Sequence, residues 1–293
     1  MTHDTYQNQW KEWNSLGFIP GPDEDEQSYI KRINYCLTLK EHLTKNNQIE
    51  LPFDDTDQNS QKFLENAFPQ TKDLYGIRPS WVLLFLSNYQ LKPWQGGCAW
   101  IFQMDENSPT SAFIQLRKQF SVSPTYLKIY DRNELLMHEC AHIGRMVYQE
   151  PKFEEFFAYQ SSTSKFRQWF GPFIQSSKES LLFVLILGIV IFADLAYLAT
   201  GHGMHWVHWL KLFPILMIFG GLLRLILRHD TLRKCRLNLE FILNPLQTRH
   251  LMYRLRDDEI ESFARFSKTE ILDFIEKEKN HSFRWKFLND IYF

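Results

Sequence analysis

The sequence contains little cysteine, carries almost no net charge and has no apolar leader at its start. Its four cysteines follow no regular spacing, which fits a reducing compartment. The 33 lysines and arginines nearly balance the 34 acidic residues, so the formal net charge is −1 and there is no basic excess to attract nucleic acid. The polar stretch 1–5 lacks the apolar core of a signal peptide. We therefore expect no nucleic-acid partner and no cleaved leader.

Two long apolar segments contrast with the otherwise polar sequence. Residues 181–200 and 207–227 each reach about twenty residues, the length needed to cross a bilayer core of roughly 30 Å. A pair of buried core helices is the alternative, but water-soluble proteins seldom contain two such segments with so short a polar break. The sequence predicts a two-helix transmembrane hairpin over residues 179–228, which would make the lipid bilayer a partner.

Basic residues lie at the two outer ends of the predicted hairpin: Lys165, Arg167, Lys178, Arg228, Arg233, Lys234 and Arg236. The connecting segment 201–209 contains histidines and tryptophans but no lysine, arginine or acidic residue. The positive-inside rule then places both soluble parts on the cytoplasmic side. We expect an integral protein of a bacterial-type inner membrane or its equivalent, with both termini in the cytoplasm.

Several residues lie near the predicted membrane boundaries. Asp194, Lys211 and Arg224 are within or at the ends of the spans, where we expect them to reach headgroup water rather than to take part in transport. Residues 156–178 combine aromatic side chains with Lys165 and Arg167. This composition predicts a segment at the membrane surface, although packing against the soluble domain would give the same composition.

The pentad His138-Glu139-Cys140-Ala141-His142 lies in a segment, 133–148, that is predicted to be helical. Side chains four residues apart share one face of a helix, so the two imidazoles can bind a single metal ion. Glu139 is turned partly aside, where it can take a proton from a water on that ion. Cys140 points away from the histidine face and is expected to pack in the core. The pattern is the HExxH signature of zinc hydrolases.

A second helix is predicted directly after the pentad, over residues 150–159. Pro151 ends the first helix, and the apolar stripe that follows turns the chain back toward the histidines. A carboxylate of this second helix is therefore within reach of the same ion. Glu155 and Glu154 are both candidates for the third ligand.

Glu155 lies three residues before Ala158, and this spacing after HExxH resembles the gluzincin metallopeptidases. The resemblance implies a Zn²⁺ ion bound by His138, His142 and Glu155, with Glu139 as the general base. Two histidines and one glutamate leave the fourth position open, as catalytic zinc requires. The similarity covers about twenty residues, and Tyr159 stands where several members of the family carry aspartate.

Upstream of the pentad the sequence predicts a mixed fold of the α+β class. A helix is expected over 23–43, followed by short strands at 81–86, 99–103 and 112–116. By the gluzincin resemblance, the strand ending at Leu116 is a candidate edge strand for binding extended substrate, with a core strand or a simple hairpin as the alternatives. We therefore predict a zincin-like metal-binding domain at 1–178, the hairpin at 179–228 and a helical cytosolic region at 229–293.

The function expected from these features is a membrane-anchored zinc peptidase with a peptide or protein substrate. Candidates for stabilising the oxyanion are Tyr126, Arg145, Tyr148 and Tyr159. One alternative is a metallohydrolase that resembles the peptide deformylases, in which Cys98 would be the third ligand. The other is a catalytically inactive membrane scaffold that binds a partner through its hairpin and C-terminal helices.

Overall fold

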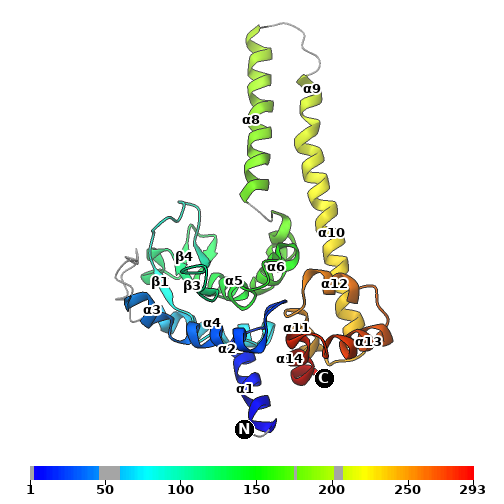
Figure 1. Cartoon of the computed structure of the whole chain (residues 1–293). Coiled ribbons are helices and arrows are strands. Elements are labelled where there is room, and N and C mark those ends of the chain that lie inside the picture. The colour runs from blue at the N-terminus through cyan, green and yellow to red at the C-terminus, as the bar shows by residue number, and fades with distance from the viewer. Residues whose placement is uncertain (1–2, 46–59, 175–176, 201–206) are drawn as a thin grey trace.

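The computed structural model describes residues 3–45, 60–174, 177–200 and 207–293. The expected α+β class is confirmed, with helices predominating over strands in these ranges. Figure 1 shows a body of helices and a small sheet, from which two long helices, α8 and α10, project. The chain begins with four helices: α1 (His3–Ser15), α2 (Glu26–Leu37), α3 (Leu39–Lys45) and α4 (Ser60–Tyr75). The single helix predicted over 23–43 is thus divided between α2 and α3.

The three predicted strands are present as β1 (Leu84–Leu86), β2 (Gly97–Phe102) and β3 (Ser111–Leu116). They pair in the order β1–β3–β2, with β3 parallel to β1 and antiparallel to β2. All residues of β3 are buried; it has a strand neighbour on each side and also contacts α2 and α5. The expectation that the strand ending at Leu116 forms an edge is therefore wrong. The edge strands of this sheet are β1 and β2.

A small two-stranded ribbon follows, formed by β4 (Thr125–Tyr126) and β5 (Tyr130–Asp131) after the short helix η1 (Lys118–Ser121). Its turn contains Leu127 and Lys128, with φ angles of 53° and 57°. This left-handed backbone allows the chain to reverse within a few residues. The ribbon leads directly into the next helix.

The predicted pair of helices around the pentad is present as α5 (Arg132–Gly144) and α6 (Pro151–Ala158), which pack against each other. Asp131 caps α5 by accepting the backbone N–H groups of Asn133 and Glu134. The helix ends before the predicted position, and Gln149 adopts a φ of 51° in the connection. Pro151 occupies the first turn of α6, where its missing N–H costs no hydrogen bond. The predicted return of the chain toward the histidines is thus confirmed.

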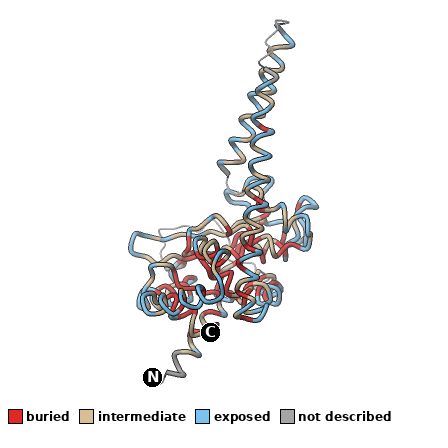
Figure 2. The backbone as a smooth tube through the Cα atoms, turned by 90° about the vertical axis from the view of Figure 1, so that its right-hand side faces the viewer, coloured by how far each residue is buried: buried red, intermediate tan, exposed pale blue. Residues whose placement is uncertain are grey.

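After α6 come η2 (Tyr159–Ser161), α7 (Lys165–Phe170) and η3 (Gly171–Phe173), which lead to the hairpin. The hairpin consists of α8 (Ser177–Thr200) and α10 (Leu212–Glu240), with the short α9 (Val207–Leu210) between them. Lys178–Ala199 and Leu212–Glu240 are long and apolar enough to cross a membrane. Figure 2 shows that the projecting part has mostly exposed and half-buried residues. The second helix begins at Leu212 and not at 207, and residues 201–206 of the predicted outer loop lie outside the described ranges.

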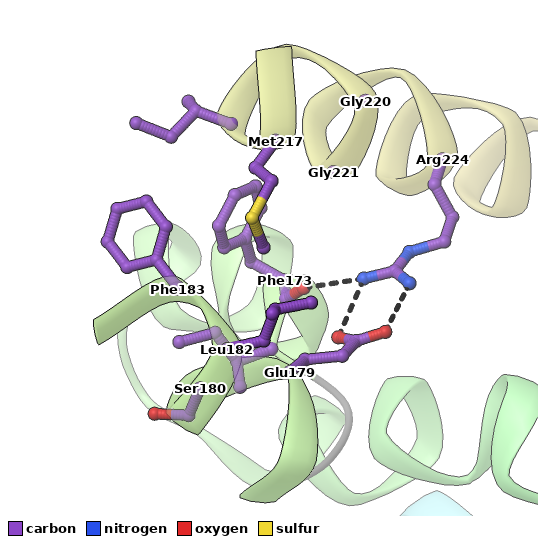
Figure 3. A pocket seen from close by; sticks show the side chains of 11 residues that line it. Phe173, Glu179, Ser180, Leu182, Phe183, Met217, Gly220, Gly221 and Arg224 are labelled. Carbon is purple, nitrogen blue, oxygen red and sulfur yellow. Dashed lines mark hydrogen bonds and ion pairs between the residues drawn. The ribbon is translucent and has the colours of Figure 1, made fainter. Parts of the chain in front are cut away.

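Charged residues of the hairpin pair with one another. Arg224 donates two hydrogen bonds to Glu179, at 2.5 and 3.0 Å, and a third to the carbonyl of Phe173 at 3.2 Å (Figure 3). A largely apolar cavity of about 340 Å³ lies beside this pair, between α8 and α10. Near the other end of the hairpin, Lys211 Nζ lies 3.1 Å from Asp194 Oδ1. These pairings account for the three charges that the sequence places in the apolar segments.

Helix α10 continues past residue 228, where the sequence analysis places the end of the hairpin. Its last part buries Leu232, Cys235 and Leu239, at a spacing that puts them on one face of the helix. This face packs against the body, including α12. One continuous helix, α10, therefore belongs to both the hairpin and the body, and no loop separates the two parts along this helix.

Four more helices complete the fold: α11 (Pro245–Met252), α12 (Asp257–Phe263), α13 (Lys268–Glu278) and α14 (Phe283–Tyr292). Their buried residues join those of the N-terminal part in one hydrophobic core. The Tyr253 hydroxyl donates to the carbonyl of Ala141 in α5 at 2.6 Å. A Cβ atom on Gly144 would lie 2.2 Å from that hydroxyl, so glycine makes room for the tyrosine. The C-terminal region therefore supports the helix that carries the pentad.

Candidate metal centre

His138, His142 and Glu155 direct their ligand atoms toward a common point. The two Nε2 atoms on α5 are 3.3 Å apart, and each lies 3.7 Å from a carboxylate oxygen of Glu155 on α6. All the ligand atoms lie within 4.8 Å of one another. Tetrahedral zinc with bonds of about 2.0–2.1 Å separates its ligand atoms by about 3.3–3.5 Å. The two Glu155 distances involve different oxygens, Oε2 toward His138 and Oε1 toward His142, so the donor set fits a zinc ion after the Glu155 carboxylate moves closer to the histidines.

Glu154, the alternative third ligand, contacts the Nδ1 side of His142 and not the Nε2 atoms that face Glu155. Its Oε1 accepts a hydrogen bond from Nδ1 of His142 at 2.7 Å. When the ring of His142 is neutral, its single proton lies on Nδ1, and Nε2 carries the lone pair that faces Glu155. The ring of His138 is held in turn by a hydrogen bond with the backbone of Ala158. Both histidines thus have the outer partners that orient metal-binding imidazoles.

Glu139 is buried at 6% exposure, and its Oε2 accepts the backbone N–H of Ala99 in β2 at 2.7 Å. Burial raises the pKa of the Glu139 carboxyl to about 7, because water no longer solvates its charged form. A carboxyl group in this range can both accept and return a proton at neutral pH. Its position beside the two histidines suits a general base.

The two histidines differ in their affinity for protons. Burial and the neighbouring His142 lower the pKa of His138 to about 3. Burial also disfavours a charge on His142, but the hydrogen bond to Glu154 and the nearby carboxylates of Glu155 and Glu139 raise its pKa to about 9. Two charged imidazoles 3.3 Å apart would repel each other. In the absence of metal the pair therefore holds one proton more than two neutral imidazoles at neutral pH, and this additional proton is on His142.

Cys98, the ligand expected for the deformylase-like alternative, does not belong to the metal-binding group formed by the described residues. Its Sγ lies 4.0 Å from Oε1 of Gln115, on the neighbouring strand β3. Burial raises the pKa of the Cys98 thiol to about 12, which opposes the thiolate that metal binding requires. Cys140 is fully buried in the core, as expected for a packing residue.

A pocket of about 310 Å³ lies beside His138 and Glu139. Tyr159 lines it, with its ring 4.8 Å from that of His138. The other three candidates for oxyanion stabilisation donate to backbone carbonyls: Tyr126 to Pro93, Tyr148 to Arg254, and Arg145 to Tyr253 and Leu255. Among the four candidates, Tyr159 is the one that lines this pocket.

Sequence analysis missed three charged residues of the pocket, Asp131, Glu134 and Arg167. Glu134 lies one helical turn before His138, so its place on the same face of α5 was available from its spacing. Its Oε1 accepts hydrogen bonds from Arg167 at 2.9 Å and from Ser162 at 2.7 Å. Arg167 lies in α7, and its distance from the pentad along the sequence does not indicate that it reaches the pocket. Glu134 and Arg167 thus add an ion pair to the pocket lining, which also includes Tyr130 and Tyr159.

The chain matches no protein-family model, no curated protein and no solved structure. Function must therefore be inferred from the chemistry of the site.

Proposed function

We propose that this protein is a membrane-anchored zinc hydrolase, and specifically a peptidase. The observation that carries the proposal is the convergence of His138, His142 and Glu155, whose ligand atoms all lie within 4.8 Å of one another. Glu139 beside the triad, and the hydrogen bond from His142 to Glu154, add the base and the outer support of a catalytic site. A structural zinc site would instead be closed by a fourth protein ligand.

The residues have distinct roles in this proposal. A bound zinc ion supplies a Lewis acid that polarises a carbonyl and acidifies water near neutral pH. Glu139 accepts the proton of the attacking water and later returns it to the leaving amine. The N–H of Ala99 holds one oxygen of Glu139, which fixes the carboxylate for this transfer. Tyr159 donates a hydrogen bond to the developing oxyanion in the pocket.

The position of β2 favours a peptide as substrate. Among the described strands of its sheet, β2 pairs only with β3. It also lies against α5, with Ala99 bonded to Glu139. An extended peptide can add to a sheet edge through its backbone, independently of most side chains. Such an arrangement would bring a backbone carbonyl close to the general base.

Anchoring by two spans is supported by the way the body is built. The helices before and after the hairpin share one hydrophobic core, so they must lie on the same side of the membrane. An even number of crossings is then required, and two helices of suitable length are available. The basic residues at the body end of the hairpin favour the cytoplasmic side.

Metal analysis of the purified chain tests the proposal directly. We expect about one zinc per chain, and loss of that zinc in His138→Ala and in His142→Ala. Cys98→Ser is the matched control and should keep its zinc. A folded wild-type protein that binds no zinc would refute the proposed function.

Hydrolysis is tested with Glu139→Gln. The amide keeps the shape of the side chain but accepts no proton, so this variant should bind zinc and lose at least about a hundredfold in turnover. Unchanged turnover of a substrate cleaved by the wild type would exclude Glu139 as the base.

A further inference from the structure

Large apolar side chains are exposed on three segments around the pocket beside His138 and Glu139, which we name the metal pocket. They are Trp94 before β2, Leu127 and Ile129 in the turn of the β4–β5 ribbon, and Phe166 and Phe170 on α7, with exposed fractions of 62, 51, 58, 68 and 37%. We name these five residues the apolar rim. Soluble proteins rarely expose such a group unless it contacts a partner or a membrane.

Direct contacts join the three segments to one another. The Tyr126 hydroxyl donates to the carbonyl of Pro93 at 2.5 Å, which ties the ribbon to the segment that carries Trp94. Arg167 Nη1 donates to the carbonyl of Ile129 at 3.2 Å, which ties α7 to the ribbon. The rings of Phe166 and Phe170 stack with their centres 4.6 Å apart. The apolar rim is therefore one connected structural feature.

The rim also borders the metal pocket. Ile129 belongs to the rim and lines the pocket at the same time. Gln95 and Arg167 line the pocket too, and each directly follows a rim residue in the sequence, Trp94 and Phe166 respectively. A surface that covers the rim would therefore lie at the entrance to the pocket.

Helix α7 connects the rim to the membrane hairpin. After Phe170 the chain passes through η3, where Phe173 accepts a hydrogen bond from Arg224 of α10 (Figure 3). It then passes the exposed Ile174 and enters α8. The short helix η3 packs against both α7 and α10. This packing places the α7 part of the rim, Phe166 and Phe170, close to the base of the hairpin.

The charges around the rim suit a lipid surface. Lys92, Lys128 and Lys165 are exposed and lie directly beside or close to rim residues in the sequence. Lys92 Nζ lies 5.6 Å from the centre of the Trp94 ring. Aromatic side chains with interspersed lysines are typical of segments in the headgroup region, where lysines meet lipid phosphates.

We infer that the apolar rim is embedded in the headgroup region of the membrane that α8 and α10 cross. The metal pocket then opens at the bilayer surface, and its substrate is a peptide segment that lies at that surface. The inference rests on the proposed membrane anchoring and peptidase function. It adds where the substrate is bound and which substrates are excluded, namely peptides that cannot approach the membrane.

Depth-dependent fluorescence quenching tests this inference on the full chain. Cys98→Ser removes the one cysteine that is not buried, and a single cysteine replaces Leu127 or Phe166 for labelling with an environment-sensitive dye. The protein is placed in vesicles of phosphatidylcholine and phosphatidylglycerol that contain a phospholipid with a nitroxide near its headgroup. We expect severalfold quenching at both rim positions.

Two matched positions make the result decisive. Leu272 on α13 is exposed at 39% and should show no lipid quenching when replaced by labelled cysteine. Phe192 on α8 is exposed at 75% and should be quenched by a nitroxide placed deep in the acyl chains. Quenching at Phe192 without quenching at the rim would overturn the inference while leaving the anchoring intact. A rim label shielded from water but not quenched by lipid would assign the rim to a protein partner and overturn it as well.

Absence of quenching at Phe192 and at the rim together would refute the membrane anchoring and this inference. Zinc content and hydrolysis are measured on separate samples, so failure of the metal site remains distinguishable from failure of the membrane contact.

Discussion

His142 donates from Nδ1 to Oε1 of Glu154 at 2.7 Å, while the Nε2 atom of the same ring faces Glu155 at 3.7 Å. Successive residues of an α-helix point about 100° apart, so these neighbouring glutamates reach opposite nitrogens of one imidazole. The geometry gives each glutamate a different role. Under the proposed function, Glu155 offers an oxygen to the metal, and Glu154 fixes the tautomer and orientation of His142.

Replacing these glutamates separately should separate the two roles. Glu155→Ala removes a ligand atom, and we expect zinc affinity to fall by several orders of magnitude. Glu154→Ala leaves all three ligand atoms in place, and the expected loss is about 10- to 100-fold. Zinc competition titrations on both variants provide the measurement, with circular dichroism as a check on folding. A larger loss in Glu154→Ala than in Glu155→Ala would reverse the assignment.

Zinc binding should depend on pH through His142. In the metal-free protein the pKa of His142 is raised to about 9, so its proton competes with zinc throughout the range below pH 9. Affinity should therefore rise with pH by up to about tenfold per unit and level off above about pH 9. Near pH 7 zinc should release about one proton from His142, with a further contribution from Glu139.

Calorimetric titrations in two buffers of different ionisation enthalpy measure this proton release. Glu154→Gln is the control, because loss of its charge lowers the pKa of His142 and should reduce the release. Zinc binding without proton release at pH 7 would contradict the assigned protonation of the pair.

The contact between Gly144 and Tyr253 predicts a specific loss of stability. A methyl group at position 144 would clash with the Tyr253 hydroxyl, so Gly144→Ala should destabilise the protein by about 1–3 kcal/mol. Gly188→Ala in α8 is the control, since a Cβ placed there meets no described atom within 4 Å apart from its chain neighbours and the backbone of its own helix. Thermal unfolding in the same detergent compares the variants. Equal stability of the two would show that α5 tolerates displacement of Tyr253.

Sidedness is tested in intact cells with a thiol reagent that cannot cross membranes. In the Cys98→Ser background, His202→Cys should react from outside, because it lies in the segment that the positive-inside rule places there. Leu272→Cys, exposed on α13, should react only after lysis. The opposite pattern of labelling would place the metal site outside the cytoplasm.

The local part of the candidate site was accessible from sequence. His138 and His142 lie on one helix, and Glu155 follows on the next helix after a short connection, so nearby sequence brings the three together. The strands and the two apolar segments also follow from short-range patterns. These features can be predicted without information about contacts between distant parts of the chain.

Other features depend on contacts between distant parts of the chain. The central place of β3 follows from its parallel pairing with β1, which no local pattern specifies. The bond from Tyr253 to Ala141 joins residues 112 positions apart, and the bond from Arg167 to Glu134 joins residues 33 positions apart. Periodicity in a single segment carries no information about such partners. For the same reason, the support of α5 by the C-terminal helices was not predicted.

Because α10 is one continuous helix, the body cannot be separated from the hairpin simply by shortening the chain. A truncation at residue 228 would remove Leu232, Cys235 and Leu239 from the core together with all of the C-terminal helices. Helix α5 would then lose its hydrogen bond with Tyr253 and its other contacts with the C-terminal helices. A chain shortened at residue 228 would therefore lack part of the core that supports α5, so the body cannot be separated from α10 by truncation and keep its stability.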